Sequence, residues 1–349
     1  MPRLEKWSAK KMSIFNILHS NKTGGAELMY LYYSEILKKA GHEVYCVVPS
    51  KFQYSSELEK LNITPLTLNI KGHYDVLAAL KLYLLVRKYQ PEIIMAHNGR
   101  SFAAINLIRK FIKAKTIAVS HGGSLKRLLK FDLVIPVAKY IKRNLIDRNY
   151  SGEIKHIANF RKITPYKKSK KKDFNFGIIG RLNPEKNIAL AIRSFSEFVK
   201  SETNNAKLII AGSGPEKDNL VKLVNDLSIN QNVVFLDWVK DLEEFFGQVN
   251  VMLLPSFEEP FGLVILEAFN YYTPVISSNK GGPLEIIQDE ETGFFFESNN
   301  EQDLLDKMLF TYQNQKILDK ISQNAYASLK EHYSFQAGEQ KLLNIIKSL

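Results

Sequence analysis

The sequence contains a single cysteine and no long hydrophobic run. Cys46 alone cannot form a disulfide within the 349-residue chain or contribute to a cysteine metal cluster. No apolar run approaches the roughly 18 to 20 residues that a membrane-spanning helix needs. The short apolar run at 14–18 ends at polar residues too soon for a signal peptide. We therefore expect the protein in the reducing cytoplasm.

Two common ligand-binding motifs are also absent from the sequence. Gly-x-Gly-x-x-Gly, which binds dinucleotides at the start of a helix, does not occur, and this argues against a dehydrogenase. Asp-x-Asp does not occur either, so a metal held by a pair of neighbouring carboxylates has no obvious ligands. We expect neither a metal nor a bound cofactor.

Positive charge is concentrated in the first half of the chain. Residues 1–172 hold 33 Lys and Arg against 11 Asp and Glu, a net charge of +22, whereas residues 173–349 hold 15 against 25, a net charge of −10. Such a charge favours an anionic partner, either nucleic acid or an anionic membrane leaflet. Basic and aromatic residues do not interleave as they do in RNA-binding sheets, which disfavours nucleic acid.

The length of the chain favours two domains rather than one core. Thr164-Pro165 and the lysine-rich residues after it combine proline, like charges and no apolar position, which is typical of a linker. Apolar strands alternate with helices on both sides, so we predict an α/β protein with two Rossmann-like domains. We place a flexible arm at 1–11, the first domain at 12–166, a basic linker at 167–172, the second domain at 173–333 and a last helix at 334–349.

The stretch 255–268 has the chemistry of a nucleotide-sugar site. A buried strand ends at Pro255, and a helix should begin near Phe261, where Gly262 lets backbone N–H groups approach an anion. Glu259 and Glu267 flank that helix start. Carboxylates bind phosphate poorly but suit the hydroxyls of an attached sugar. An ordinary surface helix with two solvated glutamates is the alternative.

The same stretch resembles the Glu-x7-Glu donor motif of retaining glycosyltransferases with the GT-B fold, the group 1 or family four-like enzymes. The resemblance implies that Glu259 holds hydroxyls of the transferred sugar and that Glu267 holds those of the ribose. It assigns the donor diphosphate to the N–H groups of one turn: Phe261, Gly262, Leu263 and Val264. It also implies that the two domains face each other across a cleft and that the last helix crosses back onto the first domain.

A second motif, Gly180-Arg181 followed by Lys186, lies between a strand and a helix and matches the phosphate clamp of that family. Negative charge builds on the departing diphosphate when its bond to the sugar breaks. Arg181 and Lys186 can stabilise this charge through charge-assisted hydrogen bonds. Two fixed cations would then act in place of a metal.

The first half carries less of the resemblance. Gly24 and Gly25 begin a helix after the first strand, as in a Rossmann-like unit. The resemblance implies that they lie over the donor phosphates and the acceptor. His97 and His121 each follow a strand. The resemblance favours His121 as the histidine that contacts the sugar near its reacting centre. A histidine with a pKa near neutrality could donate a hydrogen bond there or exchange a proton with the acceptor.

The site for the nucleobase is less clear from the sequence. Family members usually have a glycine where Asp237-Trp238 stands, and the loop there holds the base through backbone groups. Val239 remains a plausible base contact. This departure from the family pattern leaves the identity of the base open.

Three basic amphipathic segments in the first half could form the surface that contacts the anionic partner. Segments 102–113, 124–130 and 139–148 each combine apolar and basic residues, which favours a peripheral contact with anionic lipid headgroups. An ordinary solvated face is the alternative for each one. A further helix is expected over 76–89, with apolar positions at Leu77, Leu80, Leu84 and Leu85.

The resemblance implies a metal-independent enzyme that transfers a hexosyl unit from a nucleoside diphosphate sugar to an acceptor hydroxyl with retention. We expect a UDP-sugar as donor. The acceptor would be a saccharide or a lipid-linked glycan of bacterial lipopolysaccharide or capsule synthesis. Two alternatives stay open: a nucleotide-sugar epimerase or hydrolase of the same fold, and a non-catalytic basic protein that binds membrane or nucleic acid. Nothing in the sequence indicates the oligomeric state.

Overall fold

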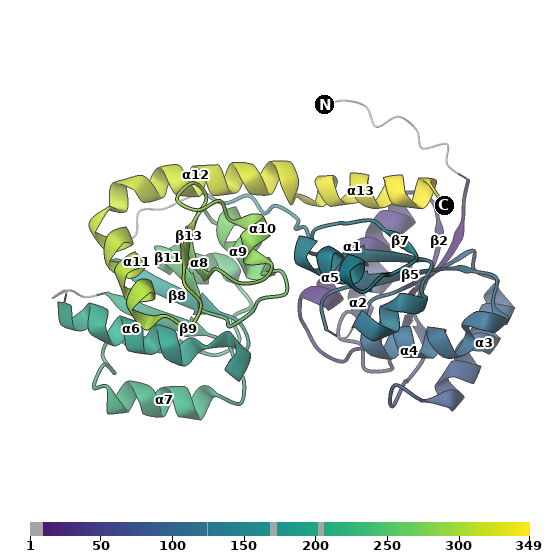
Figure 1. Cartoon of the computed structure of the whole chain (residues 1–349), viewed down its shortest axis with the longest axis horizontal. Coiled ribbons are helices and arrows are strands. Elements are labelled where there is room, and N and C mark those ends of the chain that lie inside the picture. Colours follow the sequence, from purple (N-terminus) through teal and green to yellow (C-terminus); the bar gives the residue numbers. More distant parts are fainter. Residues whose placement is uncertain (1–9, 124, 168–172, 202–205) are drawn as a thin grey trace. The chain divides into compact units, whose positions relative to one another are not determined.

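The computed structural model describes residues 10–123, 125–167, 173–201 and 206–349 (Figure 1). The chain forms two compact units, one of Met1–Asn159 with Gln336–Leu349 and the other of Phe160–Phe335. The first division lies ahead of the linker predicted at 167–172, because Arg161 already pairs with the second unit. Its N–H donates to the carbonyl of Tyr333, and its own carbonyl accepts from the N–H of Phe335, both at 2.8 Å. Most of the predicted arm at 1–11 and of the linker lies outside the described residues.

Unit 1 is built on a seven-stranded parallel sheet with strand order β3-β2-β1-β4-β5-β6-β7. Its strands are β1 (Ser13–Ile17), β2 (Glu43–Val48), β3 (Leu66–Thr67), β4 (Ile93–Ala96), β5 (Lys115–Ser120), β6 (Leu133–Pro136) and β7 (Glu153–Ile154). Its helices are α1 (Gly25–Lys39), α2 (Ser55–Lys60), α3 (Val76–Tyr89), α4 (Gly99–Ile108) and α5 (Lys139–Asp147), with short 3-10 helices at Arg109–Phe111 and Leu125–Lys130. Helix α13 (Phe335–Lys347) belongs to this unit from Gln336 onward.

Unit 2 holds a six-stranded parallel sheet with strand order β10-β9-β8-β11-β12-β13. Its strands are β8 (Asn175–Ile179), β9 (Lys207–Ala211), β10 (Val233–Leu236), β11 (Val251–Leu254), β12 (Val275–Ser278) and β13 (Phe294–Phe296). Its helices are α6 (Ile188–Ser201), α7 (Lys217–Asp226), α8 (Leu242–Gln248), α9 (Leu263–Asn270), α10 (Pro283–Ile286), α11 (Glu301–Gln313) and α12 (Gln315–His332), with a short 3-10 helix at Pro184–Lys186. The two parallel sheets confirm the prediction of two Rossmann-like domains.

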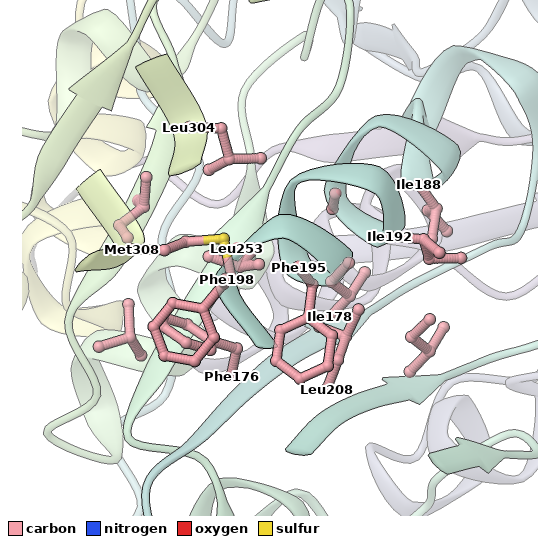
Figure 2. Packing of buried hydrophobic residues seen from close by; sticks show 14 of the residues in the cluster. Phe176, Ile178, Ile188, Ile192, Phe195, Phe198, Leu208, Leu253, Leu304 and Met308 are labelled. Carbon is pink, nitrogen blue, oxygen red and sulfur yellow. The ribbon is translucent and has the colours of Figure 1, made fainter. Parts of the chain in front are cut away.

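The core of unit 2 shows why its strands read as continuous apolar runs. Every residue of β11 and β12 is buried, as expected for a parallel sheet that is covered on both faces. Phe195 and Phe198 of α6 lie against Phe176 of β8, with ring centroids 6.3 and 5.3 Å away (Figure 2). Leu304 and Met308 of α11 join the same cluster. This packing holds the central strands, and therefore the loops that follow them, in fixed register.

Each sheet changes its direction of strand addition between two central strands. In unit 2 the change falls between β8 and β11, and in unit 1 between β1 and β4. Ligands of open α/β sheets bind beside the carboxyl ends of the strands at such a switch point. In unit 2 the loops at that point are 180–187 and 255–262, which carry the two motifs of the sequence. In unit 1 they are 18–24 and 97–98.

Helix α3 forms where its apolar spacing predicts a helix, but its buried face is not the one that the leucines mark. Leu77, Leu80 and Leu84 are exposed. The buried positions are instead Ala78, Ala79, Leu82 and Val86. The spacing predicts a helix correctly but cannot tell which face is buried, because α3 is apolar on both sides. Among the described residues, no helix combines the length and apolarity that a membrane span requires.

Candidate active site

The N-terminus of α9, which we call its mouth, carries backbone N–H groups that can bind an anion within unit 2. The helix begins at Leu263, and Gly262 precedes it with φ +95°, a left-handed conformation that favours glycine. Among the described residues, no acceptor takes a hydrogen bond from the N–H of Leu263 or Val264. These donors, together with the positive end of the helix dipole, can receive a phosphate.

Lys186 and Glu259 meet beside this helix mouth. The Lys186 ammonium lies 2.5 Å from a carboxylate oxygen of Glu259, and the two side chains are 22% and 12% exposed. Ser256 donates its hydroxyl to the same oxygen at 3.2 Å. The Cγ of Glu259 lies 3.4 Å from the place where a Cβ on Gly262 would stand. The two motifs of the sequence therefore converge on one point.

Backbone contacts hold the two loops together below these side chains. The N–H of Phe257 donates to the carbonyl of Glu185 at 3.1 Å, which joins the lysine loop to the glutamate loop. Gly281 and Gly282 pack against the other side, and the N–H of Gly282 donates to the carbonyl of Glu259 at 2.7 Å. A Cβ on Gly281 would stand 2.4 Å from that carbonyl oxygen. The glycine pair is thus required by the close approach of the two backbones.

Arg181 extends from a loop that is shaped by close glycine packing. A Cβ on Gly212 would stand 1.8 Å from the carbonyl oxygen of Gly180, and the N–H of Leu182 donates to the carbonyl of Ser213 at 2.9 Å. The Arg181 side chain is exposed and makes no ion pair with any residue in the described part of the chain. Its charge helps to hold the pKa of the Glu185 carboxyl below its usual value, after the larger effect of a hydrogen bond from Asn183. This guanidinium can therefore turn toward a ligand without breaking an existing pair.

Glu267 lies further along α9 and pairs with Arg161. One of its oxygens is 2.7 Å from a terminal nitrogen of the guanidinium. Burial raises the pKa of the Glu267 carboxyl, and Arg161 opposes that shift. The Nε of Arg161 is buried and has no hydrogen-bond partner in the described part of the chain. The pair keeps a carboxylate at a partly buried position, 21% exposed, while its second oxygen, Oε2, makes no hydrogen bond within the described part of the chain.

A hollow of about 500 Å³ opens next to this pair. Its lining residues are Arg161, Thr164, Lys240, Asp241, Leu242, Glu243 and Tyr271. Val239 is half-buried and comes directly before this lining, in the loop that follows β10. Asp237 of the same loop pairs with Lys217 at 2.6 Å. The hollow is shallow and open to solvent.

The structure brings His97 and His121 together in unit 1. The Nδ1 of His97 lies 3.3 Å from the Nε2 of His121, and the rings stack with centroids 5.6 Å apart. His97 is 1% exposed, and the rings of Tyr30 and Tyr33 meet it edge-on. The Nδ1 of His121 has no hydrogen-bond partner in the described part of the chain.

The expectation that His121 has a pKa near neutrality is wrong. Burial lowers its pKa to about 4, and burial together with the neighbouring His121 lowers the pKa of His97 as well. Both rings are therefore neutral at pH 7. One ring nitrogen of His121 contacts His97, and the other, Nδ1, is buried and has no hydrogen-bond partner in the described part of the chain. With this low pKa, His121 is not suited to exchange a proton near neutral pH.

Gly24 and Gly25 begin α1 at the carboxyl end of β1, as predicted. Gly24 is the residue before the helix, and its carbonyl accepts from the N–H of Leu28 at 3.0 Å. A Cβ on Gly24 would stand 3.1 Å from a carboxylate oxygen of Glu27. The Glu27 side chain would have to move by a few tenths of an ångström to admit a larger residue at position 24. Glu27 also places a carboxylate at the start of the helix.

Two family models match consecutive parts of the chain. Residues 23–161 match the model described as Glycosyltransferase Family 4, and residues 159–328 match the model described as Glycosyl transferases group 1. The chain belongs to the group 1 glycosyltransferases. The two family models meet at residues 159–161, where the chain also divides into its two units.

Individual relatives agree with this family. The chain is 34% identical over 174 residues to an uncharacterized glycosyltransferase of Methanocaldococcus jannaschii, which covers 48% of this chain and 43% of the relative. It is 29% identical over 173 residues to a poly(ribitol-phosphate) alpha-N-acetylglucosaminyltransferase of Staphylococcus aureus, which covers 49% and 35%. The matched part is thus less than half the length of each of these curated relatives.

A solved structure resembles almost the whole chain. The Anabaena protein HepE, crystallised with UDP and glucose, superposes with a TM-score of 0.84 over 97% of this chain and 100% of its own. The sequence identity is 20%. This likeness establishes the GT-B fold for this group 1 glycosyltransferase.

The sequence did not indicate a role for two residues of the site in this group 1 glycosyltransferase, or the contact between its two histidines. Ser256 and Arg161 hold the two motif glutamates, and His97 contacts His121. Arg161 and Glu267 are 106 positions apart, so no local pattern could signal their contact. The adjacency of β4 and β5 could have signalled the histidine pair, because both residues directly follow these strands.

In the described part of the chain, no group of three or more His, Cys, Asp or Glu is arranged to hold a metal ion. Metal independence remains a prediction for this group 1 glycosyltransferase. Adding a chelator to an activity assay would test it.

Proposed function

We propose that the protein transfers a hexosyl unit from a nucleoside diphosphate sugar to an acceptor hydroxyl. A UDP-sugar is the favoured donor. The observation that carries this proposal is the contact between Lys186 and Glu259 at the mouth of α9, next to N–H groups that have no acceptor among the described residues. A cation and two amide donors suit a phosphate, and a carboxylate beside them suits sugar hydroxyls.

Different parts of the donor would bind at different positions along α9 and the turn before it. The diphosphate would accept hydrogen bonds from Leu263 and Val264, with Phe261 and Gly262 shaping the turn. Glu259 would hold hydroxyls of the sugar. Glu267, through the oxygen that does not meet Arg161, would hold ribose hydroxyls.

The nucleobase would lie toward the loop after β10. The hollow that begins at Lys240 also includes Arg161, the partner of Glu267. A ribose on Glu267 would therefore direct the base toward this hollow. Val239, directly before Lys240, remains the proposed base contact.

The bond between the anomeric carbon and the diphosphate oxygen breaks in the proposed step, and its electron pair stays on the diphosphate. Arg181 and Lys186 stabilise the charge that develops there. The acceptor oxygen bonds to the anomeric carbon on the same face, and its proton passes to the leaving phosphate oxygen. Retention of the anomeric configuration follows from this same-face attack.

The residues of unit 1 have supporting roles in the proposal. His121, neutral at pH 7, would form a hydrogen bond with the transferred sugar through Nδ1, which is buried in this structure and would have to become accessible when the sugar binds. Gly24 and Gly25 would lie close to the donor phosphates. Neither role requires a proton to be exchanged with the histidine.

The acceptor is proposed to be a saccharide or lipid-linked glycan of a bacterial surface polymer, such as lipopolysaccharide or capsule. The named substrate of the Staphylococcus aureus relative, a poly(ribitol-phosphate), supports an anionic acceptor of this class. The net charge of +22 in residues 1–172 also supports it. We place the reaction in the cytoplasm, with the protein peripheral to the inner membrane face.

Product analysis separates this proposal from its alternatives. Purified protein would be incubated with UDP-glucose, with and without a saccharide acceptor, and the released UDP and sugar products measured. A transferase forms a new glycoside only with the acceptor. An epimerase or hydrolase changes the donor without it, and a non-catalytic binder leaves the donor intact.

The base of the donor can be identified by measuring how UDP-, GDP- and ADP-sugars change the thermal unfolding temperature of the protein. A ligand that binds only the folded protein raises its stability by about 2.7 kcal/mol at a hundredfold excess over the dissociation constant. We expect the UDP-sugar to give the largest increase. An equal lack of effect from all three would contradict the proposal.

A further inference from the structure

Helix α3 carries a row of leucines on its exposed face. Leu77 is 74% exposed, Leu80 is 53% exposed and Leu84 is 57% exposed. Their spacing of three and four residues places them in one row along the helix. Exposed leucines are ordinary when they are scattered, but a contiguous row of them is a mark of an interaction surface.

The exposed row is not needed to hold α3 in place. The opposite face packs into unit 1 through Ala78, Ala79, Leu82 and Val86, which are all buried. The helix also begins with a side-chain cap, because Asp75 accepts from the N–H of Ala78 at 3.0 Å. The leucine row is therefore additional to the packing that the fold requires.

The apolar surface continues beyond these three leucines. Tyr74 and Val76, at the start of α3, are 86% and 68% exposed. Phe111 is 72% exposed, and its ring lies 6.5 Å from that of Tyr83 on α3. Helices α3 and α4 lie side by side in unit 1 (Figure 1). Phe111 ends the 3-10 helix that follows α4. We call this surface the α3 patch: Tyr74, Val76, Leu77, Leu80, Leu84 and Phe111.

Cations border the α3 patch on both sides. Lys81 and Lys88 are exposed and stand on one side of the leucine row by helical spacing, and exposed Arg87 stands on the other. Exposed Lys110 and Lys113 flank Phe111. Helix α3 contains no acidic residue. Long basic side chains can lay their stems along apolar surface and keep their charges at a headgroup layer.

We propose that the α3 patch docks on the surface of an anionic lipid bilayer. The leucines and aromatic rings enter the headgroup boundary, and the flanking cations pair with anionic headgroups. The basic segments at 102–113, 124–130 and 139–148 predict a surface of this kind in the first half. Most of its apolar part lies on and just before α3, outside those segments, and only Phe111 comes from 102–113. Ser124 of the second segment lies outside the described residues.

A second copy of the chain fits the α3 patch less well. In a two-fold contact the same surface meets itself, so the cations of one α3 would approach those of the other. Like charges at such a distance oppose the contact, whereas anionic headgroups neutralise them. The inference rests on the peripheral membrane location in the proposed function, but its test is separate from the proposed reaction, because vesicle binding is measured without any donor sugar.

Vesicle flotation tests the proposal with the full chain. The protein is mixed with vesicles of phosphatidylcholine alone or of phosphatidylcholine with phosphatidylglycerol, and the floated fraction is measured at low and high salt. We expect binding to the anionic vesicles that weakens as salt rises. The triple change Leu77→Ser, Leu80→Ser and Leu84→Ser should reduce the partition coefficient by about tenfold or more.

A matched triple in unit 2 is the control. The changes Val221→Ser, Leu284→Ser and Ile317→Ser remove exposed apolar side chains of similar type, with exposures of 37%, 56% and 37%, and should leave the binding unchanged. If the α3 triple fails to fold, the pair Lys81→Gln and Lys88→Gln decides, and it should weaken binding to anionic vesicles by about fivefold or more.

Three results would overturn the proposal. The first is no binding of the unmodified chain to anionic vesicles. The second is equal binding by the α3 triple and the control triple. The third is a change in oligomeric state, seen by sedimentation of the α3 triple, without any change in vesicle binding, which would assign the patch to a second copy of the chain.

Discussion

At the scale of single residues, the contact between Lys186 and Glu259 defines the site. Without a ligand the two charges neutralise each other at 2.5 Å, and both side chains are mostly buried. A diphosphate at the mouth of α9 would compete with Glu259 for the ammonium. The freed carboxylate would then be available to sugar hydroxyls, so donor binding would place both groups in their working positions.

Removing the ammonium should impair turnover much more than folding. We expect Lys186→Ala to lower the rate of glycosyl transfer by roughly a hundredfold or more, because it removes a charge that stabilises the leaving diphosphate. Steady-state kinetics with a UDP-sugar would measure this. Lys200→Ala is the matched control, since Lys200 pairs with Glu197 at an exposed position and should behave as the unmodified protein. Equal rates for both variants would refute the assigned role.

The histidine pair should make the stability depend on pH. The pKa of His121 falls from 6.5 to about 4 on folding, so the unfolded chain takes up a proton in that window before the folded chain does. The free energy of unfolding should therefore decrease as the pH falls from 6.5 toward 4, at up to ~1.4 kcal/mol per pH unit for this group. The lowered pKa of His97 acts in the same direction.

Urea unfolding between pH 4 and 7 tests this dependence. His121→Gln should flatten the decline by removing one of the two buried imidazoles. His332→Gln, at a side chain that is 56% exposed, is the control and should keep the slope of the unmodified protein. The same slope in both variants would mean that His121 is not buried in its neutral form.

The position of a site residue was predictable where a local motif contains it. Glu259, Lys186 and Gly262 lie in two short patterns, and the structure brings all three to one point. The pair of Arg161 and Glu267 joins distant parts of the chain and has no local signal. The low pKa of His121 comes from burial, which its sequence neighbours do not reveal.

At the scale of elements, Gly262 determines how α9 begins. Its φ of +95° is a backbone conformation that is strained for any residue with a side chain. A Cβ there would also stand 2.8 Å from the Cδ1 of Ile265. We expect Gly262→Ala to lower the free energy of unfolding by about 1–2 kcal/mol. Urea unfolding of unit 2 would measure the loss.

The control for that change is Gly247→Ala in α8. A Cβ at Gly247 would meet no atom within 4 Å, so alanine should be neutral or should stabilise the helix by up to about 1 kcal/mol. Equal losses in the two variants would show that the backbone conformation of Gly262 is not what matters.

The positions of helices and strands were largely predictable, but their faces were not. Alternating apolar runs and turns indicate the strands, because the parallel sheets bury them on both sides. The leucine spacing of α3 has a helical period on either face. Burial of the alanine side and exposure of the leucine side follow from packing against the rest of unit 1, which the spacing does not contain.

At the scale of the whole molecule, the chain leaves unit 1 after Asn159 and returns to it at Gln336. Polybasic composition predicts the linker at 167–172. Unit 2 begins earlier, at Phe160, because Arg161 forms backbone hydrogen bonds with Tyr333 and Phe335 of that unit. The chain therefore divides at Asn159, ahead of the residues whose composition predicts a linker.

The return of the chain should be essential for unit 1. Residues Leu342, Leu343, Ile345 and Ile346 of α13 are buried, and burial of four such side chains is worth about 6–12 kcal/mol, which rivals the stability of a whole domain. Deleting residues 336–349 should therefore destabilise unit 1 and leave unit 2 folded. Hydrogen exchange read by mass spectrometry would show fast exchange in peptides of unit 1 only.

The control for this deletion removes only Ser348 and Leu349, which follow α13. It should leave the exchange of both units unchanged. Slow exchange in unit 1 after the full deletion would contradict the assignment of α13 to that unit.

Calorimetric titration of UDP tests the central claim most directly, since the claim is that a nucleoside diphosphate binds at the mouth of α9 against Arg181 and Lys186. The account predicts that UDP binds the unmodified protein and that the double change Arg181→Ala and Lys186→Ala weakens binding by about tenfold or more. Binding of equal strength in both proteins, or no heat of binding for UDP, GDP or ADP in the unmodified protein, would contradict it.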